Sequence, residues 1–169
     1  MDHVVLVDED DREIGTMDKM EAHVTGTLHR AFSILVFNSR GEILIQQRAA
    51  DKYHSAGLWT NTCCSHPRPN ETIRQAGIRR LQEEMGIHAE PDFLYKFVYR
   101  APLENGLVEH ELDHVLRATF DGTPVPNRAE VQAWKYIPVP ELLADVSAHP
   151  EKYTCWFRMI LQYQYPASR

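Results

Sequence analysis

The chain has 169 residues, of which 43% are hydrophobic and 25% are charged, as in an ordinary globular domain. Its net charge is -6 and it has no lysine- or arginine-rich run, so a nucleic acid is not expected as a partner. No stretch approaches the roughly 20 apolar residues of a membrane span, and the acidic N-terminus lacks the apolar run of a signal peptide. We therefore expect a single cytoplasmic domain over residues 1–169, without a membrane partner. The sequence does not predict an oligomeric state.

The first half of the chain predicts two hairpins and a long loop. Residues 3–16 resemble a strand, an acidic turn and a second short strand, and residues 17–23 predict a short helix. Residues 30–48 form the clearest hairpin, in which Gly41 suits the turn. Residues 49–70 predict a loop, and a loop of that length inside a compact domain usually has a functional role.

The second half alternates helices with strands. Residues 71–86 predict a helix that Asn70 caps and Gly86 ends, with an apolar stripe of Ile78, Leu81 and Met85. Strands are predicted at 93–101, 107–120 and 133–139, and helices at 140–150 and 153–164. Because hairpins dominate, we expect an α+β fold, with a mixed β-sheet flanked by helices, rather than a doubly wound parallel sheet.

The strand at 107–120 places three carboxylates, those of Glu109, Glu111 and Asp113, on one face. Carboxylates are depleted in strands and like charges repel, so the strand either faces solvent at a sheet edge or has a bound cation that relieves the repulsion. In the second case Glu109 and Glu111 would be hard oxygen ligands. Histidines near loops and strand starts could complete such a site, although spacing alone does not bring them together: His23, His29 and His66.

The helix at 71–86 carries Arg79 and Arg80 one turn before Glu83 and Glu84. These residues suit either a solvated face with i,i+4 pairs or a face that binds Mg2+ and a diphosphate. Three more cations could lie around the same anion or simply face solvent: Lys19, Arg48 and Lys52.

The loop sequence Thr-Asn-Thr-Cys-Cys-Ser-His-Pro contains two of the three cysteines. An odd, low number of cysteines argues against a disulfide framework. Cys64 is either a buried structural cysteine or an acid, base or nucleophile, whereas Cys63 is interpreted as structural. Trp156 is either a core residue or a ring that stabilises a cation in a pocket.

The segment from Glu71 to Ile87 resembles the Nudix box, with two departures. Ser65 replaces the first glycine of the pattern, and Arg80 replaces a glutamate that binds metal in Nudix hydrolases. The cysteine loop, the Glu-x-Glu strand and the sequences Leu-His-Arg-Ala-Phe-Ser-Ile-Leu-Val-Phe-Asn and Phe-Val-Tyr-Arg-Ala resemble type 1 isopentenyl diphosphate isomerases, over about residues 3–165.

This resemblance implies an intramolecular isomerase that converts isopentenyl diphosphate to dimethylallyl diphosphate in isoprenoid biosynthesis. It implies catalytic roles for Cys64 and Glu111, with Tyr99 bonded near the glutamate. It implies a Mn2+ or Mg2+ site formed by His23, His29, His66, Glu109 and Glu111. A second Mg2+, which arrives with the substrate, would bind Glu84 and the backbone carbonyl of Cys64. Substrate-binding positions would be Lys19, Arg48, Lys52, Arg80 and Trp156.

Two other functions remain open at this point. The Glu83–Glu84 pair favours a Nudix hydrolase of nucleoside diphosphate compounds, and Arg80 argues against it. A metal-binding or ligand-sensing module without catalysis would keep the fold but not need the acid/base residues. Turnover of the substrate, and release of phosphate from it, separate these functions.

Overall fold

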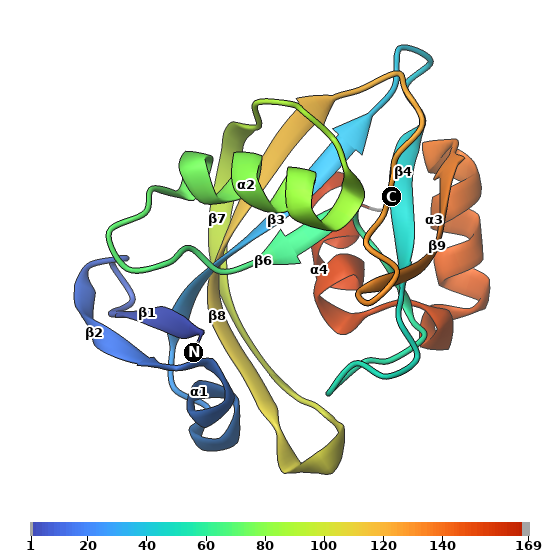
Figure 1. The fold of residues 1–169 in the computed structure, drawn as a ribbon. Coiled ribbons are helices and arrows are strands. Elements are labelled where there is room, and N and C mark those ends of the chain that lie inside the picture. The colour runs from blue at the N-terminus through green and yellow to red at the C-terminus, as the bar shows by residue number, and fades with distance from the viewer. Residues whose placement is uncertain (1, 167–169) are drawn as a thin grey trace.

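The computed structural model describes residues 2–166, and Figure 1 shows how its strands and helices are arranged. The elements follow in chain order: β1(His3–Val7), β2(Glu13–Asp18), α1(Lys19–Thr25), β3(His29–Phe37), β4(Ile43–Arg48), β5(Trp59–Thr60), β6(Cys63–Ser65), α2(Ile73–Met85), β7(Asp92–Pro102), η1(Glu104–Gly106), β8(Val108–Thr119), β9(Val131–Ile137), α3(Val139–Ala148), η2(Pro150–Lys152) and α4(Cys155–Gln164). The structure confirms the expected mixed sheet with helices.

Strand β3 is the centre of the sheet. It runs parallel to β8, from the pair His29–Glu111 to the pair Phe37–Thr119, and antiparallel to β1, β4 and β6. Strand β8 pairs on its other side with β7, and β4 pairs with β5 and β9. The parallel pairing of β3 with β8 brings together two segments that are far apart in the sequence.

The two faces of the sheet are covered by different helices (Figure 1). Alternate side chains of a strand point to opposite faces. Leu35 and Phe37 of β3 therefore pack with α3 and α4, whereas Ile34 and Val36 pack with α2. On β8, Val115 lies on the same face as Leu35. The odd-numbered residues of both strands thus face α4, and these include the carboxylates of Glu109 and Glu111.

Helix α2 begins later than predicted. Its N-cap is Thr72, whose side chain accepts from the Gln75 N–H while Gln75 returns a bond to the cap. Asn70 instead lies in the preceding turn with a positive φ of 68°, so its prediction as the cap was wrong. Gly86 ends the helix in the left-handed conformation, as predicted.

Two further sequence interpretations need correction. The loop predicted at 49–70 contains the short strands β5 and β6, and β6 carries the cysteine pair. The strand at 107–120 is not a solvent-facing edge, because β8 lies between β3 and β7 and its carboxylates are buried. None of the helices in the described part of the chain has the length and apolar character that crossing a bilayer requires.

Candidate active site

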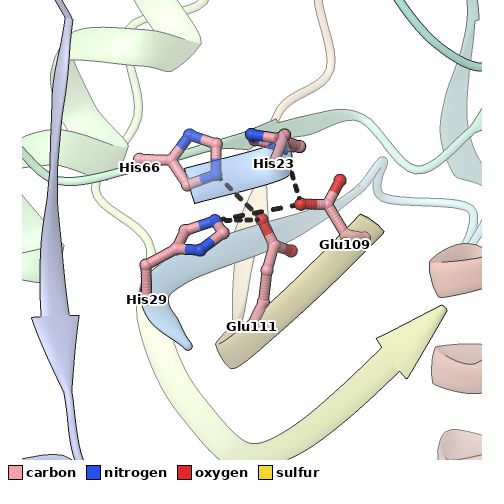
Figure 2. Close-up of side chains that lie close together, drawn as sticks. All are labelled: His23, His29, His66, Glu109 and Glu111. Carbon is pink, nitrogen blue, oxygen red and sulfur yellow. Dashed lines mark hydrogen bonds and ion pairs between the residues drawn. The ribbon is translucent and has the colours of Figure 1, made fainter. Parts of the chain in front are cut away.

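Five side chains converge near the end of the face that α4 covers (Figure 2). Their ligand atoms all lie within 4.8 Å of one another, and we call this set the five-donor cluster: His23, His29, His66, Glu109 and Glu111. Helix α1 supplies His23, β3 begins with His29, and His66 follows β6. Strand β8 supplies both glutamates, on one face because they are two residues apart. The predicted convergence of these residues is therefore found in the structure.

Backbone contacts orient two of the imidazoles. The Nδ1 of His23 lies 2.7 Å from the Lys19 carbonyl oxygen, and the Nδ1 of His29 lies 2.9 Å from that of Thr27. An N–H must occupy Nδ1 to donate to a carbonyl, so in a neutral ring Nε2 carries the lone pair. Both Nε2 atoms face the glutamates, as histidines that bind metal do.

The arrangement has an electrostatic conflict that a cation would resolve. The Nε2 of His23 lies 2.9 Å from Oε1 of Glu109, which brings two lone pairs together when this carboxyl is ionised. These two atoms and the Nε2 of His29 are buried without a hydrogen bond. Nitrogen and oxygen donors of this kind suit a divalent transition-type ion or Mg2+. The five-donor cluster therefore fits a metal ion.

The two glutamates of the cluster have opposite pKa shifts. Burial and the charge of Glu111 raise the pKa of Glu109 well above its usual range. Burial also acts to raise the pKa of Glu111, but the neighbouring imidazoles of His29 and His66 outweigh it and hold that pKa well below its usual range. Burial lowers the pKa of His66 to about 4. The cluster thus holds Glu111 as the carboxylate and keeps His66 neutral.

Cys64 and Glu111 line one cavity, which we call the central cavity, and Trp156 lines it as well. The thiol of Cys64 lies 2.9 Å from Oδ1 of Asn61 and accepts a hydrogen bond from Trp156 Nε1 at 3.1 Å. Burial raises the pKa of Cys64 to about 12, so the thiol keeps its proton at neutral pH. Tyr99 lies opposite Glu111 across β7 and β8, and its hydroxyl donates to Oε1 at 2.6 Å.

Several cations also line the central cavity. The four cations predicted to bind substrate all line it: Lys19, Arg48, Lys52 and Arg80. Burial and the charge of Arg48 lower the pKa of Lys52, which means that positive charges are crowded there. An anion would relieve this crowding.

Carboxylates surround Arg80 at the wall of the central cavity. Its guanidinium donates to Glu84 at 2.8 Å, to Glu130 at 2.7 Å and to Glu83 at 2.8 Å. Arg79 instead pairs with Glu71 and Glu83 and is absent from the residues that line the cavity. The two adjacent arginines therefore differ, since Arg79 stabilises the helix and Arg80 faces the site.

Sequence reasoning did not assign a site role to several other residues that line the central cavity, among them Ser33, Tyr53, His54 and Glu130. Tyr53 packs its ring against the ammonium groups of Lys19 and Lys52, with centroid distances of 5.3 and 5.9 Å. Both Tyr53 and His54 belong to the long loop, whose length was the one available signal.

Comparisons with known proteins agree on the fold and on one activity. The NUDIX domain family matches residues 27–157. The chain is 55% identical over 155 residues to "Isopentenyl-diphosphate Delta-isomerase 1" of Aromatoleum aromaticum, covering 92% of this chain and 88% of that protein. It is 52% identical over 161 residues to "Isopentenyl-diphosphate Delta-isomerase" of Burkholderia multivorans, covering 95% and 92%.

Solved structures are similar in fold at low sequence identity. A crystal structure of a Deinococcus radiodurans protein superposes with a TM-score of 0.78 at 19% identity, covering 97% of this chain and 99% of that one. A MutT protein from Methanosarcina mazei gives a TM-score of 0.67 at 17% identity, covering 80% and 91%.

Proposed function

The chain belongs to the isopentenyl-diphosphate Delta-isomerases that have a NUDIX domain, and from this we propose how its central cavity converts isopentenyl diphosphate to dimethylallyl diphosphate. The observation that supports the proposal best is that a thiol and a carboxyl line one cavity. Cys64 and Glu111 line the same cavity, together with Trp156 and a group of cations. The charged substrate fits the cytoplasmic location expected from the sequence.

The cations that line the cavity would bind the diphosphate. Lys19, Arg48, Lys52 and Arg80 supply charge-assisted hydrogen bonds to its oxygens. Glu84 and the backbone carbonyl of Cys64 would hold the Mg2+ that arrives with the substrate, because Mg2+ prefers oxygen ligands and phosphate. This anchoring supplies binding energy away from the reacting carbons and directs the five-carbon unit toward Cys64 and Glu111.

The reaction moves a carbon–carbon double bond by one position. One group gives a proton to the terminal CH2 of the alkene, which leaves a tertiary cation on the neighbouring carbon. A second group removes a proton from the carbon on the other side of that cation, and the new double bond forms there. Cys64 would serve one side of the five-carbon unit and Glu111, with Tyr99, the other.

The intermediate cation needs stabilisation and protection from water. The ring of Trp156 would provide stabilisation through its π face. The guanidinium of Arg48 already lies 5.4 Å from the centroid of this ring, so the ring can accept a positive neighbour. Exclusion of water from the cavity by the bound substrate would protect the cation from capture.

The five-donor cluster would hold Mn2+ or Mg2+. A bound ion there would govern how readily Glu111 keeps a proton. Tyr99 and His66 would fix the orientation of the same carboxyl through hydrogen bonds of 2.6 and 2.8 Å.

A product assay tests the proposed function. The protein would be incubated with isopentenyl diphosphate and Mg2+, the alkene protons followed by NMR, and free phosphate and diphosphate quantified. We expect dimethylallyl diphosphate without phosphate release. Phosphate or diphosphate release without conversion would instead support a hydrolase.

Replacement of the thiol tests the proposed roles. Cys64→Ala should abolish turnover and leave the fold and the metal content unchanged, because the side chain is partly exposed to the cavity and lies outside the five-donor cluster. Cys155→Ala is the matched control, since Cys155 does not line the central cavity, and it should keep near-normal rates. Near-normal turnover by Cys64→Ala would remove the thiol from the mechanism.

A further inference from the structure

His54 is a buried histidine that belongs neither to the five-donor cluster nor to the proposed acid/base pair. It lies between β4 and β5, is 3% exposed, and lines the central cavity. Its ring contacts both Glu109 of the five-donor cluster and Trp156 of the cavity wall.

The two carboxylate oxygens of Glu109 have different surroundings. Oε1 faces the other donors of the cluster, 2.9 Å from the Nε2 of His23 and 3.8 Å from that of His29. Figure 2 shows this oxygen directed at the two imidazoles and the second oxygen pointing away from them. That second oxygen, Oε2, lies 3.5 Å from the Nε2 of His54. His54 therefore contacts the oxygen that the cluster does not use.

Several contacts fix the ring of His54 in this place. The Ser55 hydroxyl lies 3.1 Å from Nδ1, and the guanidinium of Arg48 donates to the His54 carbonyl oxygen at 3.1 Å. The ring stacks on His23 at 5.6 Å and meets Trp156 edge to face at 5.8 Å. When the Ser55 hydroxyl donates to Nδ1, the ring proton is on Nε2, the nitrogen that lies 3.5 Å from Oε2 of Glu109.

We propose that His54 is a positioning residue that holds the outer oxygen of Glu109 through Nε2–H, so that Oε1 stays directed at the metal ion. A partner of this kind fixes the orientation and basicity of a ligand, and its removal typically lowers metal affinity about 10- to 100-fold. The same ring sets the position of Trp156 relative to the cluster. The inference rests on the proposed function for the identity of the metal site.

Two variants separate hydrogen bonding from packing. In His54→Gln, the amide nitrogen reaches about as far as Nε2 and can still donate to Glu109. In His54→Asn, the amide reaches only as far as Nδ1, so the contact with Ser55 can persist while that with Glu109 is lost. His149→Gln is the matched control, because His149 is exposed and contacts only Glu151 among the ion pairs of the described chain.

The measurement is Mn2+ binding by the full-length protein after treatment with EDTA, with free Mn2+ quantified by electron paramagnetic resonance. We expect His54→Asn to bind Mn2+ about 10- to 100-fold more weakly than the parent protein. His54→Gln should stay close to the parent value, and His149→Gln should equal it. Excess Mn2+ should restore the isomerase rate of His54→Asn, which a damaged fold would not allow.

Two results would overturn the proposal. One is parent-like Mn2+ affinity in His54→Asn, and the other is an equal loss in His54→Asn and His54→Gln, which would indicate packing alone. His54→Phe, which keeps a ring without a donor, is judged by the first criterion if His54→Asn does not fold. The same experiment also tests whether the five-donor cluster is a metal site at all. If it is not, Glu109→Gln will bind Mn2+ as well as the parent protein does.

Discussion

Removal of the metal ion should lower the free energy of unfolding, and the contacts of the five-donor cluster indicate by how much. Three buried polar atoms of the cluster have no hydrogen bond: Nε2 of His23, Nε2 of His29 and Oε1 of Glu109. Each unsatisfied buried group costs about 1–3 kcal/mol. A cation held by the cluster would supply the missing partner of these atoms, so its binding would favour the folded state.

The size of the effect follows from linkage between binding and folding. A ligand at 100 times its Kd stabilises the folded state by about 2.7 kcal/mol. For a chain of this length, each kcal/mol raises Tm by about 2–4 °C. Saturating Mn2+ should therefore raise the Tm of the EDTA-treated protein by about 5–10 °C.

The assay is differential scanning calorimetry of the EDTA-treated protein during a Mn2+ titration. Glu109→Gln should lose most of the Tm increase, whereas Glu9→Gln, at an exposed position, should keep it. Because burial and the charge of Glu111 raise the pKa of Glu109, ionised Glu109 destabilises the metal-free fold. Metal-free Glu109→Gln should therefore be at least as stable as the metal-free parent at neutral pH.

The same pKa shift predicts a pH dependence. A proton held by Glu109 must leave before the carboxylate binds metal, so the Mn2+-induced Tm increase should grow as pH rises from the acidic to the neutral range. The reasoning would be refuted if Mn2+ did not change the Tm of the parent protein. An equal Tm increase in Glu109→Gln would refute it as well.

Three further outcomes are expected. Glu84→Gln should raise the Mg2+ concentration needed for turnover and weaken diphosphate binding, and an unchanged Mg2+ titration would remove Glu84 from the substrate site. Burial raises the pKa of Cys64 to about 12, so the rate of its alkylation by iodoacetamide should rise about tenfold per pH unit through the neutral and mildly alkaline range. A rate that levels off near the ordinary pKa of a thiol would contradict this burial effect. Asp11→Asn should lower the free energy of unfolding by about 1–3 kcal/mol, because Asp11 accepts a hydrogen bond from Arg30 at 2.8 Å and lies 2.9 Å from His114 Nε2. Asp10→Asn, at an exposed position, is the control and should change the free energy of unfolding little.

Local patterns in the sequence predicted most helices and strands, whereas the members of the metal cluster were predicted partly from such patterns and partly from the resemblance to a known family. Alternation along one strand is a local rule, so the shared face of Glu109 and Glu111 followed directly from their spacing. The convergence of His29 with Glu111 did not, because it depends on the parallel pairing of β3 with β8. Only the resemblance to a known family indicated it. A local reading of the carboxylate strand allowed a solvent-facing edge, and the sheet topology excludes that reading.

Residues whose roles come from tertiary contacts were the ones missed. His54 has no periodicity and no motif, and its position depends on Arg48, Ser55 and Trp156. Asn70 was predicted as the helix cap from residue type, but the reciprocal bonds of Thr72 and Gln75 satisfy the first turn of α2 and leave Asn70 outside it. In both cases the competing contact was visible only in three dimensions.

Arg80 gives a physical reason why this NUDIX-domain chain is suited to isomerisation. The position carries a metal-binding glutamate in the hydrolase pattern, and here a guanidinium contacts Glu83, Glu84 and Glu130 instead. A fixed positive charge next to Glu84 disfavours a cluster of several cations on this helix. Under the proposed function, the same guanidinium would bind oxygens of the diphosphate, because guanidinium groups bind phosphate in a bidentate manner. Under the same proposal, Glu84 would hold the Mg2+ that arrives with the substrate, and a second ion would bind the five-donor cluster beside Glu111.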